Sequence, residues 1–216
     1  MCGAWQPKYD LTMRKIRIIL YGLVLLALLG WGALWLREGG STKLGLDGLS
    51  VNTGIAVGGP FALVDTGGRT VTEATYRGRW MLVYFGYTFC PDVCPTELQT
   101  MANALDALGP DAAKIAPIFI TIDPARDTPA TLAGYVKLFD DRLIGLTGTD
   151  AQIAAVARAY RVYFARAERK DTTQYLMDHS SFLYLMGPDG NLRALYRPGT
   201  SVQELSSALR TRLAGG

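Results

Sequence analysis

An uncharged run of nineteen residues near the start of the chain restricts its architecture more than any other feature. Residues 18–36 read IILYGLVLLALLGWGALWL. As a helix this run measures about 28 Å, close to the hydrocarbon thickness of a bilayer. A buried core helix would be interrupted by polar residues, and a cleaved signal peptide would be followed by a good small-x-small site. We therefore expect a single membrane-spanning anchor, with Trp31 and Trp35 near one interface.

The charges around this run predict its orientation. Four basic residues precede it and two closely follow it: Lys8, Arg14, Lys15 and Arg17, then Arg37 and Lys43. By the positive-inside rule the N-terminus is cytoplasmic and the rest of the chain is exported. The N-terminal region lacks the Arg-rich, amphipathic character of a mitochondrial transit peptide. We therefore expect a single-pass protein of a bacterial inner membrane with its C-terminal domain in the periplasm, rather than one of the mitochondrial inner membrane.

The net charge of +3 divides unevenly between the two parts of the chain. Residues 1–44 carry six Lys/Arg and two Asp/Glu, or +4, whereas residues 45–216 carry sixteen and seventeen, or −1. A basic nucleic-acid-binding domain is therefore not expected, and neither is a nucleic-acid partner. We predict a cytoplasmic N-terminus at 1–17, the anchor at 18–36, a flexible Gly/Ser-rich tether at 37–54 and one domain at 55–216.

Apolar runs that alternate with helical spacing predict the element order of this domain. A first hairpin is expected around Phe61–Asp65 and the turn at Gly67 and Gly68. The other predicted strands are Trp80–Gly86, Ile115–Ile122, Leu143–Leu146, Ser181–Met186 and Leu192–Arg197, and the predicted helices are Pro95–Leu108, Pro129–Phe139, Ala151–Tyr160 and Ser201–Leu213. This order predicts an α/β domain with a thioredoxin-like central mixed sheet flanked by helices.

Two cysteines stand in the turn between a buried strand and the helix that follows it. The segment reads YTFCPDVCPTE, with Cys90 and Cys94 separated by three residues. Cys94 is expected at the N-cap or beside it, with Pro95 as the first helical residue. Unpaired N–H groups and the helix dipole then favour a thiolate at Cys94 and also at Cys90. Such a pair can bind a soft metal ion, exchange disulfides or form a small structural disulfide.

His179 is the only histidine in the chain and precedes the predicted strand Ser181–Met186. If that strand runs antiparallel to the central parallel strands, it begins at their carboxyl-terminal edge. The cysteine turn lies at the same edge, where α/β sheets bind their ligands. Two thiolates and one imidazole would then meet. This set suits copper better than zinc, which prefers four ligands in structural sites.

Asp123 follows the second central strand and is expected at the same edge of the sheet. It is a candidate for a hydrogen bond to a metal ligand, or it begins an Asx turn. Asp127 and Thr128 are expected to cap the next helix, and Asp150 the one after it.

Three stretches of the sequence resemble the Sco (SenC/PrrC) family: YFGYTFCPDVCPTEL at 84–98, TIDPARDTP at 121–129 and DHSSFLYLMGPDG at 178–190. The resemblance implies a membrane-tethered copper protein with Cys90, Cys94 and His179 as ligands. It also implies a role in maturing the copper A centre of cytochrome c oxidase, with subunit II of the oxidase and a periplasmic copper donor as partners.

Two classes of function remain open for the same residues. A metallochaperone binds and transfers copper without turnover of its own, so it is not an enzyme. A thiol–disulfide oxidoreductase uses Cys90 and Cys94 as a redox-active dithiol, either to reduce cysteines of the oxidase or as a redox sensor. A thiol peroxidase is disfavoured, because neither cysteine follows the Pro-x-x-x-Thr-x-x-Cys spacing.

Overall fold

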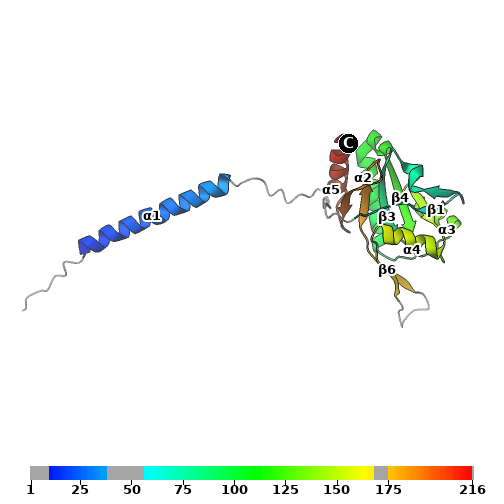
Figure 1. The fold of residues 1–216 in the computed structure, drawn as a ribbon, viewed down its shortest axis with the longest axis horizontal. Coiled ribbons are helices and arrows are strands. Elements are labelled where there is room, and N and C mark those ends of the chain that lie inside the picture. The colour runs from blue at the N-terminus through cyan, green and yellow to red at the C-terminus, as the bar shows by residue number, and fades with distance from the viewer. Residues whose placement is uncertain (1–9, 38–55, 168–174, 216) are drawn as a thin grey trace, which may run out of the picture. The chain divides into compact units, whose positions relative to one another are not determined.

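The computed structural model describes residues 10–37, 56–167 and 175–215 (Figure 1). The chain divides into two units, Met1–Gly45 and Leu46–Gly216. The first contains helix α1 (Asp10–Arg37), which includes the expected anchor at 18–36. In the part of the chain described, no helix is both long and apolar enough to cross a membrane. The expected tether at 37–54 lies, except for its first residue, outside the described residues.

Two parallel strands form the centre of the second unit. All seven residues are buried both in β3 (Trp80–Gly86) and in β4 (Ile115–Thr121). Their register runs from Trp80 opposite Ile115 to Gly86 opposite Thr121. A strand covered on both faces needs apolar side chains at successive positions, and these two runs have them. Both strands were expected from the sequence, and both are confirmed.

Five further strands complete a seven-stranded mixed sheet of order β2-β1-β5-β4-β3-β8-β9. β5 is parallel to β4, whereas the outer pairings, including β8 on β3, are antiparallel. These strands are β1 (Ala62–Asp65), β2 (Thr70–Thr72), β5 (Ile144–Thr147), β8 (Leu183–Met186) and β9 (Leu192–Tyr196). Because β8 is antiparallel to β3, its first residues lie at the edge where β3 ends, as expected for the segment after His179.

Helices flank this sheet, as the sequence predicts (Figure 1). They are α2 (Val93–Leu108), α3 (Pro129–Val136), α4 (Asp150–Ala159) and α5 (Val202–Ala214), with short 3₁₀ helices η1 (Glu73–Tyr76) and η2 (Gly109–Lys114). Thr128 caps α3 as expected, because its hydroxyl accepts the N–H of Thr131. Asp150 is not the cap of α4: Thr149 takes that role in a capping box with Gln152.

A separate two-stranded hairpin was not predicted from the sequence. It pairs β6 (Phe164–Ala167) with β7 (Leu176–His179) and projects away from the main sheet in Figure 1. Phe164 lies opposite His179 in its antiparallel register. His179 therefore ends a strand of its own and does not simply precede β8.

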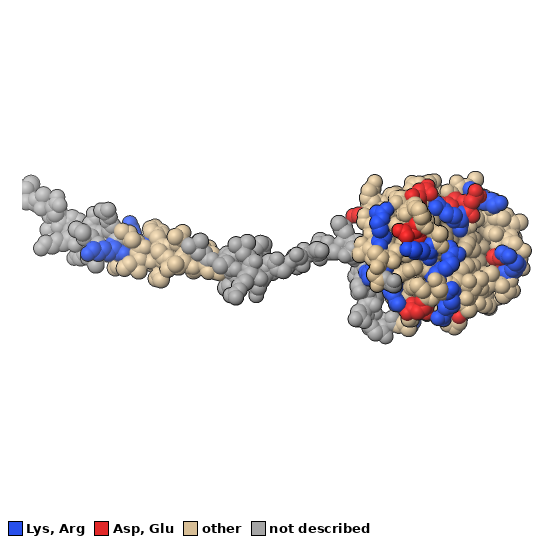
Figure 2. All heavy atoms as spheres, turned by 90° about the horizontal axis from the view of Figure 1, so that it is seen from above, with Lys and Arg blue, Asp and Glu red and all other residues tan. Residues whose placement is uncertain are grey.

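The surface of the second unit carries charges of both signs. Figure 2 shows Lys and Arg interspersed with Asp and Glu on the face in view. Several of them pair locally, such as Arg193 with Asp189 at 2.7 Å and Arg142 with Asp106 at 2.5 Å. Exposed pairs of this kind contribute little to stability.

Candidate metal centre

The end of β3 passes directly against Cys94. A Cβ atom added to Gly86, the last residue of β3, would lie 2.9 Å from Cys94 Sγ and 2.9 Å from Phe119 Cε2. Both distances are shorter than van der Waals contact, so only glycine fits there. The sulfur of Cys94 is thus packed into the core, and its side chain is fully buried.

The sulfur of Cys90 takes the position of a helix cap. α2 begins at Val93 and not at Pro95, and its N-cap residue Asp92 makes no capping bond with its side chain. Instead the N–H of Cys94 donates to Cys90 Sγ at 3.4 Å. Cys94 is therefore the second residue of the helix and not the residue directly before it, and Cys90 receives the unpaired N–H group.

The two thiols have opposite protonation preferences. Hydrogen bonding from the Cys94 side chain lowers the pKa of Cys90 to about 3, and the N–H groups of Asp92 and Cys94 act in the same direction. The same hydrogen bond, together with burial, raises the pKa of Cys94 far above its ordinary value. These shifts favour the thiolate expected at Cys90 and disfavour the one expected at Cys94. The two cysteines share one proton, which stays on Cys94, and the negative charge lies on Cys90 because its sulfur is less buried.

His179 lies beside the buried sulfur. Its Nε2 is 3.5 Å from Cys94 Sγ, and its Nδ1 is 3.1 Å from the carbonyl oxygen of Ser180. A carbonyl oxygen can only accept, so Nδ1 donates, and in the neutral ring the lone pair of Nε2 faces the sulfur. The rings of Tyr84 and Tyr87 pack edge-on against the imidazole, with centroids 6.3 Å and 6.0 Å away.

The structure thus brings together the three ligand candidates that the sequence names, Cys90, Cys94 and His179. They are neighbours without having the arrangement of a metal site, because no group of three or more His, Cys, Asp or Glu side chains in the described residues is arranged to hold a metal ion. The chemistry of the donor set fits a soft ion, because it offers one thiolate, one thiol and a neutral imidazole nitrogen. Their assignment as metal ligands remains a prediction.

Asp123 lies near the site, and its hydrogen bonds go elsewhere. One carboxylate oxygen accepts the hydroxyl of Tyr175 at 2.8 Å, and the other accepts Nε of Arg126. The described hydrogen bonds of Asp123 include none to Cys90, Cys94 or His179. Its expected bond to a metal ligand is therefore not among the contacts seen.

Asp127 holds the cysteine turn by hydrogen bonds, a role that was not predicted from the sequence. Its buried carboxylate accepts the N–H and hydroxyl of Thr88 at 3.0 Å and 2.5 Å, and the hydroxyl of Thr121 at 2.6 Å. Burial raises the pKa of Asp127, and these three hydrogen bonds oppose that shift. Asp127 therefore joins the loop before Cys90 to the end of β4. An Asp next to a capping Thr gives no sign of this in the sequence.

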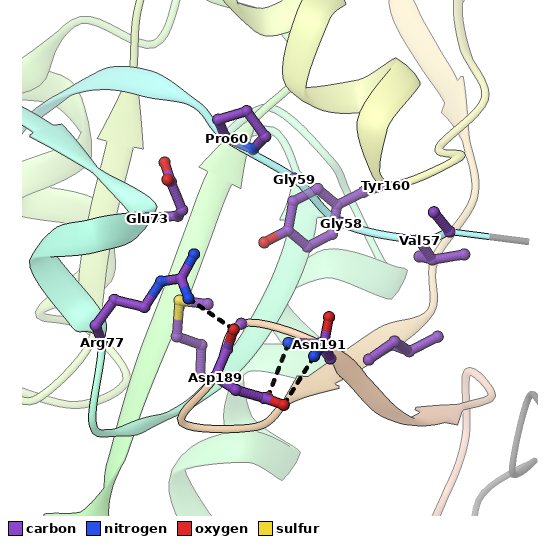
Figure 3. A pocket seen from close by; sticks show the side chains of 13 residues that line it. Val57, Gly58, Gly59, Pro60, Glu73, Arg77, Tyr160, Asp189 and Asn191 are labelled. Atoms are coloured by element: carbon purple, nitrogen blue, oxygen red, sulfur yellow. Dashed lines mark hydrogen bonds between the residues drawn. The ribbon is translucent and has the colours of Figure 1, made fainter.

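A cavity of about 330 Å³ lies elsewhere in the domain (Figure 3). Arg77, Glu73 and Tyr160 line it, and Arg77 Nη1 donates to the carbonyl oxygen of Asp189 at 2.8 Å. No cysteine or histidine is among its lining residues. Both described cysteines lie in the cysteine turn, and His179 lies beside it, so that turn is the candidate functional site.

The family model described as SCO1/SenC matches residues 50–214. The chain belongs to this family. It is 41% identical over 162 residues to human "Protein SCO1 homolog, mitochondrial", covering 73% of this chain and 53% of the relative. It is 43% identical over 162 residues to bovine "Protein SCO2 homolog, mitochondrial", covering 74% and 61%. The matched region thus spans between half and two thirds of these curated Sco proteins.

Solved structures of Sco proteins share the fold. ScoI of Arabidopsis thaliana with copper bound aligns with a TM-score of 0.71 and 41% identity, covering 74% of this chain and 100% of that one. ScoI of Bradyrhizobium japonicum with copper bound aligns with a TM-score of 0.67 and 44% identity, covering 72% and 99%. The expected thioredoxin-like α/β domain, with its mixed sheet flanked by helices, is confirmed by this agreement.

Proposed function

We propose that this Sco protein is a membrane-tethered copper metallochaperone that binds one copper ion through Cys90, Cys94 and His179. The observation that carries the proposal is the approach of His179 Nε2 to Cys94 Sγ at 3.5 Å, directly beside the Cys90 thiolate. The copper bound to the related Arabidopsis and Bradyrhizobium proteins supports the choice of metal.

The protonation of the site determines how copper enters it. The Cys90 sulfur is already a thiolate, and Nε2 of His179 has its lone pair free in the neutral ring. Cys94 holds its proton in the metal-free protein, so copper binding through both sulfurs releases that proton. Two thiolates and one imidazole make a soft, three-ligand set that suits Cu(I).

Delivery would proceed by exchange of these ligands for cysteines of a target. The family resemblance supports the copper A centre of cytochrome c oxidase subunit II as the target and a periplasmic protein as the copper donor. From the sequence we propose that residues 18–36 anchor the chain, that 37–54 form a tether and that the domain at 55–216 faces the periplasm. A tethered domain reaches membrane-bound partners on the same face. The human and bovine relatives are named as mitochondrial.

The unequal pKa values of the two cysteines favour one second function. A thiolate at Cys90 next to a protonated Cys94 is the arrangement of a dithiol in which one sulfur attacks and the other resolves. The protein would then be a thiol–disulfide oxidoreductase that reduces the cysteines of the oxidase copper site, or a redox sensor. In that function His179 has no required part.

Oxidation of the dithiol separates the two functions. The full chain in detergent is titrated with Cu(I) before and after oxidation of Cys90 and Cys94 to a disulfide, and His179→Ala is assayed for disulfide exchange. The chaperone predicts one copper bound when reduced and none when oxidised, because a disulfide removes both thiolates. Copper binding that survives oxidation contradicts it. A reduced protein without tight copper, and with exchange unaffected by His179→Ala, supports the oxidoreductase.

A further inference from the structure

The aromatic ring of Tyr175 lies between two arginines, just before strand β7. The guanidinium carbon of Arg126 is 3.7 Å from the ring centroid, and that of Arg166 is also 3.7 Å away. Arg126 comes from the loop between β4 and α3, whereas Arg166 belongs to β6 of the same hairpin. Of these two contacts, the one with Arg126 joins the hairpin to the body of the domain.

Hydrogen bonds strengthen this connection. Nη1 of Arg126 donates to the backbone carbonyl of Tyr175 at 3.0 Å, and the hydroxyl of Tyr175 donates to Asp123 at 2.8 Å. Nε of Arg126 donates to the same carboxylate, so the three residues form a closed ring of contacts. The side chains of Arg126 and Asp123 are only 16% and 5% exposed, so water competes weakly for these bonds.

Arg126 also touches the cysteine turn. Its guanidinium carbon lies 4.6 Å from the ring centroid of Phe89, the residue before Cys90, and 5.8 Å from that of Tyr87. The Tyr87 ring in turn packs edge-on against His179. Arg126 thus contacts both the cysteine turn and the residue before β7, which are the segments that carry the candidate ligands. It is not itself a candidate ligand.

The cost of burying Arg126 points to a role beyond stability. Its Nη2 is buried with no hydrogen-bond partner in the described part of the chain. Leaving a buried donor unpaired is unfavourable, so a shorter apolar side chain would be less costly at a position with a purely structural role. Local conflicts of this kind are expected at functional sites.

We propose that Arg126 is a positioning residue that fixes β7, and with it His179, against the cysteine turn. His179 is the fourth residue after Tyr175, and β7 carries the connection along the chain. The proposal rests on the proposed function in one respect, namely that His179 ligates copper. The fixing of β7 itself is independent of copper.

The test compares Arg126→Gln with Arg166→Gln in the full chain in detergent. Both variants remove one guanidinium from the same ring, and of the two only Arg126→Gln removes a contact with the body of the domain. Amide hydrogen exchange at Leu176–His179 is measured without metal, and Cu(I) affinity is measured against a Cu(I) chelator. Both measurements are repeated for Arg126→Gln in a His179→Ala background, which gives a double-mutant cycle.

We expect Arg126→Gln to speed exchange in β7 by about tenfold or more and Arg166→Gln to change it by less than about twofold. Cu(I) affinity should fall about 10-fold to 100-fold in Arg126→Gln, as for other residues that orient a metal ligand. In the His179→Ala background this further loss should disappear. Equal exchange in the two arginine variants, or a loss of affinity that persists without His179, overturns the proposal.

Two further variants protect the test against a folding defect. Arg126→Lys keeps the charge but not the planar fork, so its β7 exchange should lie between those of the wild type and Arg126→Gln. Tyr175→Phe removes only the bond to Asp123 and should speed exchange about threefold. If neither variant changes the exchange of β7, the contact does not position the strand. If β7 loosens while the wild type binds no copper, the positioning role stands and the proposed function fails.

Discussion

The cysteine turn and the β6–β7 hairpin present the candidate ligands from opposite kinds of surroundings. The turn follows a strand whose seven residues are all buried, and Cys94 packs against Gly86 and Phe119. In the hairpin no residue of β6 or β7 is fully buried. Two sulfurs are therefore fixed by the core, whereas His179 depends on a few polar and aromatic contacts. A site built in this way keeps one candidate ligand on a segment that opens at lower cost than the core.

The largest difference between the two regions should appear in stability. Leu98 of α2 is fully buried one helical turn after Cys94, whereas Leu176 of β7 is half-buried. Leu98→Ala should lower the free energy of unfolding by about 2–5 kcal/mol, because it leaves a cavity in the core. Leu176→Ala should lower it by less than about 1 kcal/mol. Urea unfolding of both variants measures the two values.

Equal losses in these variants would remove the distinction between a fixed turn and a loosely packed hairpin. The pair is matched in chemistry, since both substitutions delete the same three carbon atoms from a leucine. A small loss at Leu98 together with a large loss at Leu176 would reverse the comparison.

A smaller difference separates the two sulfurs within the turn. At neutral pH, Cys90 should react with iodoacetamide at least about a hundredfold faster than Cys94, because only the thiolate is the nucleophile and Cys94 is buried. The pKa of Cys90 is lowered to about 3 from 9.0, so its alkylation rate should be flat between about pH 5 and about pH 8. Mass spectrometry of the labelled peptides gives both rates.

An ordinary thiol behaves differently over this range, since its rate rises about tenfold for each pH unit below its pKa. Such a rise at Cys90 would show that the hydrogen bond from Cys94 does not hold its thiolate. Cys94→Ser tests the source of the lowered pKa of Cys90, because it keeps a hydrogen-bond donor of similar size at that position.

The sequence predicts the cysteine turn well because the signals are local. A continuous apolar run marks β3, helical spacing marks α2, and the two cysteines lie between them. The exact start of α2 was missed, and with it the protonation of Cys94. That protonation depends on the burial of one sulfur behind Gly86, a tertiary contact that spacing does not reveal.

The hairpin was missed for a physical reason. β6 reads FARA and β7 reads LMDH, which are short segments without an alternating pattern and with few residues that favour strands. One contact between the hairpin and the body joins Arg126 to Tyr175, 49 residues apart. His179 was located correctly through the antiparallel pairing of β8 with β3, although the strand that carries it was not foreseen.

The central claim is that Cys90, Cys94 and His179 bind one copper ion together. The most direct test is anaerobic titration of the reduced full chain with Cu(I) in competition with a chelator, beside Cys90→Ser, Cys94→Ser and His179→Ala. The account predicts one tightly bound copper in the wild type that is lost or much weakened in each of the three variants. Absence of tight copper in the wild type, or an affinity that does not change in His179→Ala, would contradict it.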